Sequence, residues 1–161
     1  MKTIISNTSP LRYLTCSVPS ALVKYFHVEE GTEQVTALIN DSNNEIWVLE
    51  LARIEFISAL FRKYRAHIIN DKQLESAIEG FEAEYSHFNV EPLTQPVAFE
   101  AEYLLKKHGK IEGLRTLDAL HFAAFRLLAE DGWYFVAADE VLSHTIQLEG
   151  FNVINPCSNR F

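Results

Sequence analysis

Short apolar runs rich in β-branched and aromatic residues alternate along this chain with longer segments in which apolar residues recur every three or four positions. The short runs predict buried strands, and the longer segments predict helices. We expect strands at residues 3–6, 45–49, 88–92, 133–137 and 151–154, with Pro92 placing the third near a sheet edge. We expect helices at 21–26, 31–40, 50–65, 70–85, 94–107, 114–128 and 139–148, and an irregular stretch at 11–20.

The regular alternation of strands with helices is typical of an α/β protein. It predicts a three-layer α/β/α sandwich with a central, mainly parallel sheet, formed by residues 1–161 as a single domain. The run at 133–137 is apolar throughout, which indicates a strand that is buried on both faces.

Residues 114–128 predict a buried helix, because apolar residues occupy nearly its whole circumference. Thr116 is a good N-cap, and Asp118 falls in the first turn, where the helix dipole or a specific partner would stabilise its charge. A buried carboxylate is costly unless it is paired, hydrogen-bonded or bound to a metal. His121 lies one turn later, and we interpret it as a packed histidine of the core or of the surroundings of Asp118 rather than as a catalytic base.

Two further acids are expected near Asp118. Asp139 follows the strand at 133–137, and Glu55 lies in the helix after the strand at 45–49. Ligands of open parallel sheets bind beyond the carboxyl ends of the strands, so we expect the three carboxylates to converge there. Like charges repel at such a site unless a cation joins them, and a set of carboxylates favours Mg²⁺ or Mn²⁺ over Zn²⁺. An ion of this kind activates a water and stabilises charge on a phosphate during hydrolysis.

Each of these acids also has an ordinary structural explanation. Asp139 alone is explained as a helix N-cap, and Glu55 as a solvated helix acid or as a partner of Arg53 or Arg62. The expected convergence of three acids is what favours the metal site.

Composition and charge narrow the possible partners. The net charge of −8 excludes a protein that holds nucleic acid by bulk attraction. Contact with RNA would need local basic groups, of which the densest are Arg62, Lys63 and Arg65, and Lys106, Lys107, Lys110 and Arg115. Cys16 and Cys157 lack metal or redox spacing, and no apolar run has the length of a membrane span. These features predict a cytoplasmic protein with reduced thiols and no membrane association.

Four segments resemble the motifs of one nuclease family. Residues 114–123, around Asp118, are very similar to the third acidic motif of the PIN domain, the nuclease fold of the VapC-type toxins of bacterial toxin–antitoxin pairs. Residues 135–140 resemble the fourth motif, with Ala137 in place of the usual Thr or Ser. Residues 49–60, around Glu55, resemble the second motif, and residues 21–31 resemble the segment that follows the first.

The first motif departs from the family pattern, in which strand one ends in Asp-Thr/Ser-Ser. The stretch Ile5-Ser6-Asn7-Thr8-Ser9 fits best, with Asn7 in the place of the acid and residues 10–20 as an insertion. An alternative alignment places Thr15-Cys16-Ser17 at the motif. Neither alignment supplies a carboxylate, because the first acid in the chain is Glu29. The resemblance therefore implies a site with fewer charges and a lower metal affinity than usual.

The resemblance implies a Mg²⁺- or Mn²⁺-dependent endoribonuclease that is homodimeric and restrained by a VapB-type antitoxin. The implied metal ligands are Asn7, Glu55, Asp118 and Asp139, of which the three acids would be catalytic. The side chains expected around them are Ser9, Thr116 and His121. The resemblance also implies that the strands ending at residues 6, 49 and 137 lie together. Because Asn7 is neutral, a second hypothesis stays open, namely a catalytically degraded PIN domain that acts only as a protein-binding partner.

Overall fold

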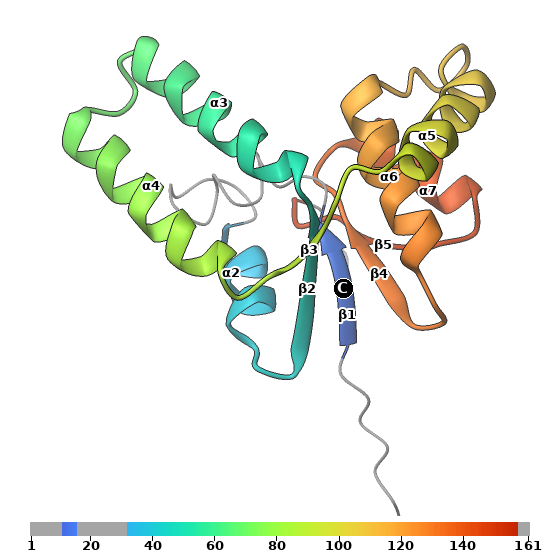
Figure 1. The fold of residues 1–161 in the computed structure, drawn as a ribbon, viewed down its shortest axis with the longest axis horizontal. Helices are drawn as coiled ribbons and strands as arrows, with labels where there is room; N and C mark the ends of the chain where they lie inside the picture. The colour runs from blue at the N-terminus through green and yellow to red at the C-terminus, as the bar shows by residue number, and fades with distance from the viewer. Residues whose placement is uncertain (1–10, 16–31, 158–161) are drawn as a thin grey trace, which may run out of the picture.

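The computed structural model describes residues 11–15 and 32–157, and five strands in this part of the chain form one parallel sheet (Figure 1). In chain order the strands are β1 (Leu11–Thr15), β2 (Asn44–Leu49), β3 (Asn89–Glu91), β4 (Trp133–Val136) and β5 (Asn152–Ile154). They lie side by side in the order β3-β2-β1-β4-β5, so β1 is the central strand. The predicted parallel sheet is confirmed, and β3 lies at an edge as Pro92 indicated.

Six helices flank the sheet within the described residues. They are α2 (Thr32–Asn40), α3 (Leu51–Arg65), α4 (Asp71–Tyr85), α5 (Gln95–His108), α6 (Thr116–Leu128) and α7 (Glu140–Leu148). In Figure 1, α2, α3 and α4 lie on one side of the sheet and α5, α6 and α7 on the other, which gives the three layers of the predicted α/β/α sandwich. None of these helices is both long enough and apolar enough to cross a membrane.

The two faces of the sheet belong to two separate hydrophobic cores. The α3–α4 core contains Phe56 of α3 and Phe81 of α4, whose rings stack with their centroids 4.0 Å apart. The α5–α7 core contains Phe122 and Phe125 of α6, and both residues meet the ring of Phe135 edge-on. A sheet that is covered on both faces needs strands that are apolar on both sides, which explains the continuous apolar run in β4.

Successive residues of the inner strands alternate between the two cores, as the pleat of a strand requires. Val48 of β2 lies in the α3–α4 core and Leu49 lies in the α5–α7 core. In β4, Val136 lies in the α3–α4 core and Phe135 lies in the α5–α7 core. Burial on both faces therefore fixes how these strands are oriented relative to the helices that follow them.

The central strand is Leu11–Thr15, which corrects the expectation of an irregular stretch at 11–20. β1 pairs with β2 and with β4, so it holds the place that we expected for the strand at 3–6, a segment that lies outside the described residues. Arg12 interrupts the apolar pattern of this strand and so hides it from a periodicity analysis. In the structure, Arg12 Nε donates to Glu45 Oε2 at 2.9 Å, and its guanidinium lies over the ring of Trp133.

Helix starts follow the capping rules in some places and depart from them in others. Asn70 and Gln73 form a capping box at the start of α4, as the predicted start at 70–71 requires. Thr116 is not the N-cap of α6, because it is the first helical residue and Arg115 takes the N-cap position without a side-chain cap bond. The predicted helix at 21–26 lies outside the described residues.

A partly buried ion-pair network joins the three helices of the α5–α7 half. The side chain of Glu149, at the C-terminus of α7, is 6% exposed and lies 2.6 Å from both Lys107 Nζ and His108 Nε2. Arg126 of α6 lies 3.3 Å from its other oxygen. Burial opposes ionisation of Glu149, but the hydrogen bonds from Lys107 and His108 and the charge of Arg126 outweigh it and lower its pKa.

We expect Glu149→Gln to lower the free energy of unfolding by about 2 kcal/mol at neutral pH, because it removes the charge that Lys107, His108 and Arg126 surround. The lowered pKa means that this stabilisation is present above the ordinary pKa of a glutamate and is lost as the pH falls through the folded-state value. Chemical denaturation across this pH range measures the difference. Glu102→Gln is the matched control, because the Glu102–Lys106 pair lies on the surface and should contribute little. Equal losses in both variants would contradict the proposed role of the network.

Candidate metal site

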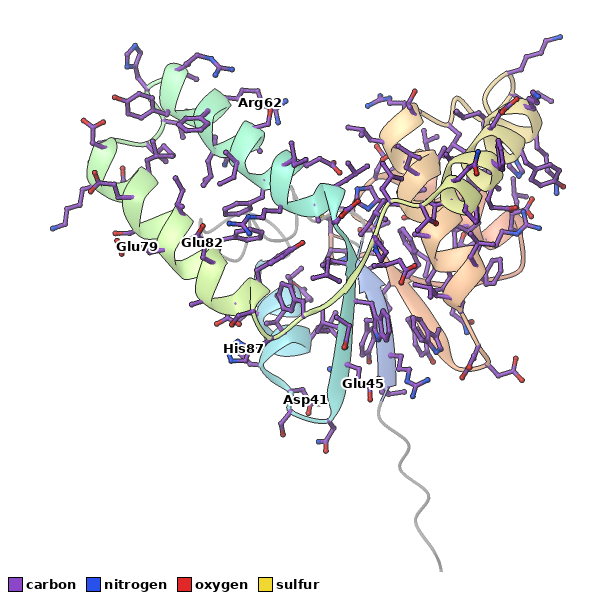
Figure 2. The ribbon with its side chains drawn as sticks, in the orientation of Figure 1. Asp41, Glu45, Arg62, Glu79, Glu82 and His87 are labelled. Carbon is purple, nitrogen blue, oxygen red and sulfur yellow. The ribbon has the colours of Figure 1, made fainter. Side chains whose placement is uncertain are left out.

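The three predicted acids lie on elements that begin at the carboxyl edge of the sheet. β2 ends at Leu49, and α3 starts two residues later and carries Glu55 in its second turn. β4 ends at Val136 and leads to Asp139, the residue immediately before α7. Asp118 is the third residue of α6. Figure 2 shows Asp41 and Glu45 at the opposite edge, where β2 begins, so those acids are separate from this group.

The pKa of Asp118 is affected by its burial and by the charges of the other two acids. Asp118 is half-buried, and burial is the main reason that its pKa is raised. The charges of Asp139 and, more weakly, Glu55 raise the pKa further, whereas His121 and Arg115 lower it. The charges of the other two acids thus act on Asp118, and the convergence of the three carboxylates on one metal ion stays a prediction.

Glu55 is held by a buried histidine. His121 Nε2 lies 2.5 Å from Glu55 Oε1, and the two side chains are 1% and 15% exposed. The expected alternative partner Arg53 instead pairs with Glu82 at 3.0 Å. Arg62 is exposed, and Figure 2 shows it on the outer part of α3, away from the sheet. His121 is thus a core histidine that also contacts a site acid, a contact that the sequence did not reveal.

Asp139 also has the ordinary role that its position suggested. Its Oδ1 accepts a hydrogen bond from the backbone N–H of Leu142 at 2.9 Å, so the carboxylate caps α7. This bond fixes the side chain at the helix N-terminus, where the helix dipole favours its negative charge. A capping role and a place beside Asp118 are compatible, because a carboxylate has two oxygens.

The donor set fits a hard divalent cation in its chemistry, although the ligands are not gathered in advance. Within residues 11–15 and 32–157, no three His, Cys, Asp or Glu side chains are close enough to form a metal-binding group. Mg²⁺ is usually held by one or two carboxylates together with several waters and substrate oxygens, so it does not need such a group. Half-buried carboxylates that repel one another are stabilised by a cation. The residues present therefore fit the ion, with Asp118 as the central candidate ligand.

Three predicted site residues remain, namely Asn7, Ser9 and Thr116. Asn7 and Ser9 lie outside the described residues, and Thr116 is exposed at the first position of α6. The residue at the carboxyl end of the central strand is Thr15, which the alternative alignment placed at the first motif. The signal that could have favoured this alignment is the sequence Leu11–Thr15, in which Leu11, Tyr13 and Thr15 alternate with other residues as in a strand.

The basic groups that were candidates for RNA contact are not equivalent. Lys106 Nζ pairs with Glu102 and Lys107 Nζ pairs with Glu149, so both charges are engaged on or near α5. Arg115 is exposed at the N-terminus of α6 and acts electrostatically on Asp118. Among the residues of the two predicted basic groups, Arg115 is therefore the candidate for contact with a phosphate beside Asp118.

The sequence matches the family model of the PIN domain over residues 19–146. Three solved structures share the fold. FitAcB from Neisseria gonorrhoeae is 16% identical with a TM-score of 0.61, and the match covers 91% of this chain and 98% of that chain. VapBC2 from Rickettsia felis, bound to a DNA fragment from its promoter, is 13% identical with a TM-score of 0.59, covering 90% and 98%. A toxin–antitoxin complex from Klebsiella pneumoniae is 14% identical with a TM-score of 0.54, covering 90% and 97%. No curated protein gives a significant match.

We expect Asp118→Asn to raise the thermal stability of the metal-free protein at neutral pH. The raised pKa of Asp118 means that the folded state disfavours its ionised form, so stability falls as the pH rises from the ordinary value of 3.8 through the folded-state value. The variant removes this charge, and its advantage should shrink as the wild type becomes protonated at low pH. Thermal unfolding in EDTA across this pH range measures the gain. Glu33→Gln, which removes an exposed acid from the first turn of α2, should give no gain. A destabilised Asp118→Asn protein would show that Asp118 is not under repulsion.

Proposed function

Because this chain belongs to the PIN domain family, we propose that it is a Mg²⁺- or Mn²⁺-dependent endoribonuclease and the toxin of a type II toxin–antitoxin pair. The observation that carries the proposal is the half-buried Asp118 near the carboxyl edge of the sheet, where burial raises its pKa and the charges of Asp139 and, more weakly, Glu55 raise it further by repulsion. Such repulsion marks a place for a cation, and this edge is where parallel sheets bind their ligands.

In this proposal Glu55, Asp118 and Asp139 hold the metal, together with Asn7 or Thr15 from the first motif. When bound, the ion supplies an activated water and stabilises the charge of the scissile phosphate. Asp118, which is half-buried and has a raised pKa, gains most from neutralisation by the ion. Asp139 is kept in place by its cap bond to Leu142. Arg115 lies at the exposed N-terminus of α6, where its positive charge suits a phosphate of the RNA.

The proposed partners are an RNA substrate, a VapB-like antitoxin and a second copy of this chain in the cytoplasm. Two of the similar solved structures are VapBC2 and a toxin–antitoxin complex, which supports an antitoxin as partner. The net charge of −8 suits a basic antitoxin segment. Exposed apolar side chains on α3 and α5, among them Ile54, Phe61, Phe99 and Tyr103, provide surface for such contacts.

The purified protein, free of antitoxin, is expected to cleave structured RNA in the presence of Mn²⁺ and to lose this activity in EDTA. Asp118→Asn should lower the cleavage rate by about a hundredfold or more, because an Asn keeps the shape of the ligand but not its charge. Gel analysis of end-labelled RNA follows the reaction. Glu33→Gln is again the control, because it removes an exposed acid from α2, a helix that carries none of the three proposed ligands. Metal-stimulated cleavage that is unchanged in Asp118→Asn would place the active site elsewhere, and its complete absence in the wild type would refute the nuclease proposal.

A second candidate function is that of a catalytically degraded PIN domain that acts only as a protein-binding partner. The observation that favours it is at the first motif, where β1 ends at Thr15 and neither this residue nor Asn7 is an acid. Ala137, in place of a Thr or Ser of the fourth motif, is fully buried and offers no hydroxyl. The two functions differ in whether three carboxylates suffice for catalysis.

Thr15→Asp separates the two functions, with Asn7→Asp as its matched comparison. If β1 carries the first motif, Thr15→Asp should tighten Mn²⁺ binding by about tenfold, because it adds a charged ligand. Asn7→Asp should then have little effect. Calorimetric titration of Mn²⁺ and the RNA cleavage assay are both measured. Activity that appears only in Thr15→Asp identifies the natural protein as the binding partner, whereas the opposite ranking of the two variants would return the first motif to Asn7.

A further inference from the structure

We propose that His121 is a positioning residue whose contact with Glu55 holds that carboxylate beside Asp118 and Asp139. The inference rests on the proposed metal-dependent function and names a residue that supports it. His121 is on α6 and Glu55 is on α3, so the contact of 2.5 Å between Nε2 and Oε1 joins helices that lie on opposite sides of the sheet.

The surroundings of His121 fix its ring. The side chain is 1% exposed, and its neighbours on α6, Ala119, Phe122 and Phe125, are fully buried in the α5–α7 core. A ring packed in this way has given up its rotamer freedom on folding. It can therefore hold a flexible partner such as Glu55 without a further loss of its own entropy.

The contacts of the two ring nitrogens indicate the direction of the hydrogen bond. Glu55 Oε1 is an acceptor when ionised, so Nε2 carries the hydrogen and donates. Nδ1 is buried and has no hydrogen-bond partner among the described residues. The bond to Glu55 is therefore the only hydrogen bond of the ring among the described residues, with Nε2 as the donor.

Glu55 needs such a support because its side chain turns about several single bonds and is only 15% exposed. An ionised carboxylate that is largely buried requires a hydrogen-bond donor. Without the bond to His121, the carboxylate would turn toward water to regain one. With the bond, Oε1 is fixed and the carboxylate stays available to a cation. Groups that orient a metal ligand in this way typically change metal affinity by about 10- to 100-fold when they are removed.

The chain contains a matched control for this contact. His108 is also a buried histidine, and its Nε2 lies 2.6 Å from Oε1 of Glu149. That pair lies in the ion-pair network of the α5–α7 half, with Lys107 and Arg126, and none of the three site acids belongs to it. Loss of the His108 contact should therefore reduce stability without affecting the metal site.

The experiment compares His121→Gln, His121→Asn and His108→Asn with the wild type. Gln places its amide nitrogen near the position of Nε2 and can still donate to Glu55, whereas the shorter Asn cannot reach it. Mn²⁺ binding to each metal-free protein is measured by electron paramagnetic resonance titration, and folding is checked by thermal unfolding in EDTA. We expect His121→Asn to weaken Mn²⁺ binding by about 10- to 100-fold and His121→Gln to restore most of the affinity. His108→Asn should unfold at a lower temperature and bind Mn²⁺ as the wild type does.

Two results would overturn the inference while leaving the proposed function intact. One is wild-type Mn²⁺ affinity in a folded His121→Asn protein, and the other is an equal loss of affinity in His108→Asn, which would make the effect one of general stability. If His121→Asn does not fold, His121→Gln tests the inference instead. A folded His121→Gln protein that loses about 10- to 100-fold in Mn²⁺ affinity would contradict the proposed donor role of His121. A wild-type protein that binds no Mn²⁺ would overturn the metal-dependent function itself and this inference with it.

Discussion

The arrangement of this protein depends on burial of the sheet on both of its faces. The inner strands β2 and β4 send alternate side chains into the α3–α4 core and the α5–α7 core, so each strand must be covered by helices from two directions. Parallel strands with helices on both faces bring the starts of those helices to one edge. The positions of Glu55 and Asp139 follow from this constraint, because each lies shortly after the end of a strand.

At that edge, the acids are stabilised by contacts within their own helix or with another helix. Asp139 serves its own helix as a cap, and Glu55 is bound to His121, so both carboxylates already have partners that stabilise them. For Asp118, burial and then the charge of Asp139 raise the pKa. Local rules of helix capping therefore explain the presence of one acid, and only the combination of the three indicates a ligand.

Much of this architecture could be predicted from the sequence, because the apolar periodicity of strands such as β4 and helices such as α6 is strong. The central strand could not, since Arg12 breaks its pattern and is accommodated only by Glu45 and Trp133 from other parts of the chain. The placement of Glu55 and Asp139 shortly after strands that end at one edge could be inferred from topology, because the carboxyl ends of parallel strands meet there. The contact between Glu55 and His121 could not, because these residues are 66 positions apart in sequence and meet only through the packing of their two helices.

The separation of the two cores affects how the three acids are positioned relative to one another. Glu55 is carried by a helix anchored through Phe56 in the α3–α4 core, whereas Asp118 and Asp139 are carried by helices anchored through Phe122 and Leu142 in the α5–α7 core. The three acids are therefore carried by both halves of the molecule, and the distances between them depend on how the two halves pack on the sheet. A movement of one half relative to the other would change these distances, and with them the affinity of the proposed cation site, without a change in any of the three acids.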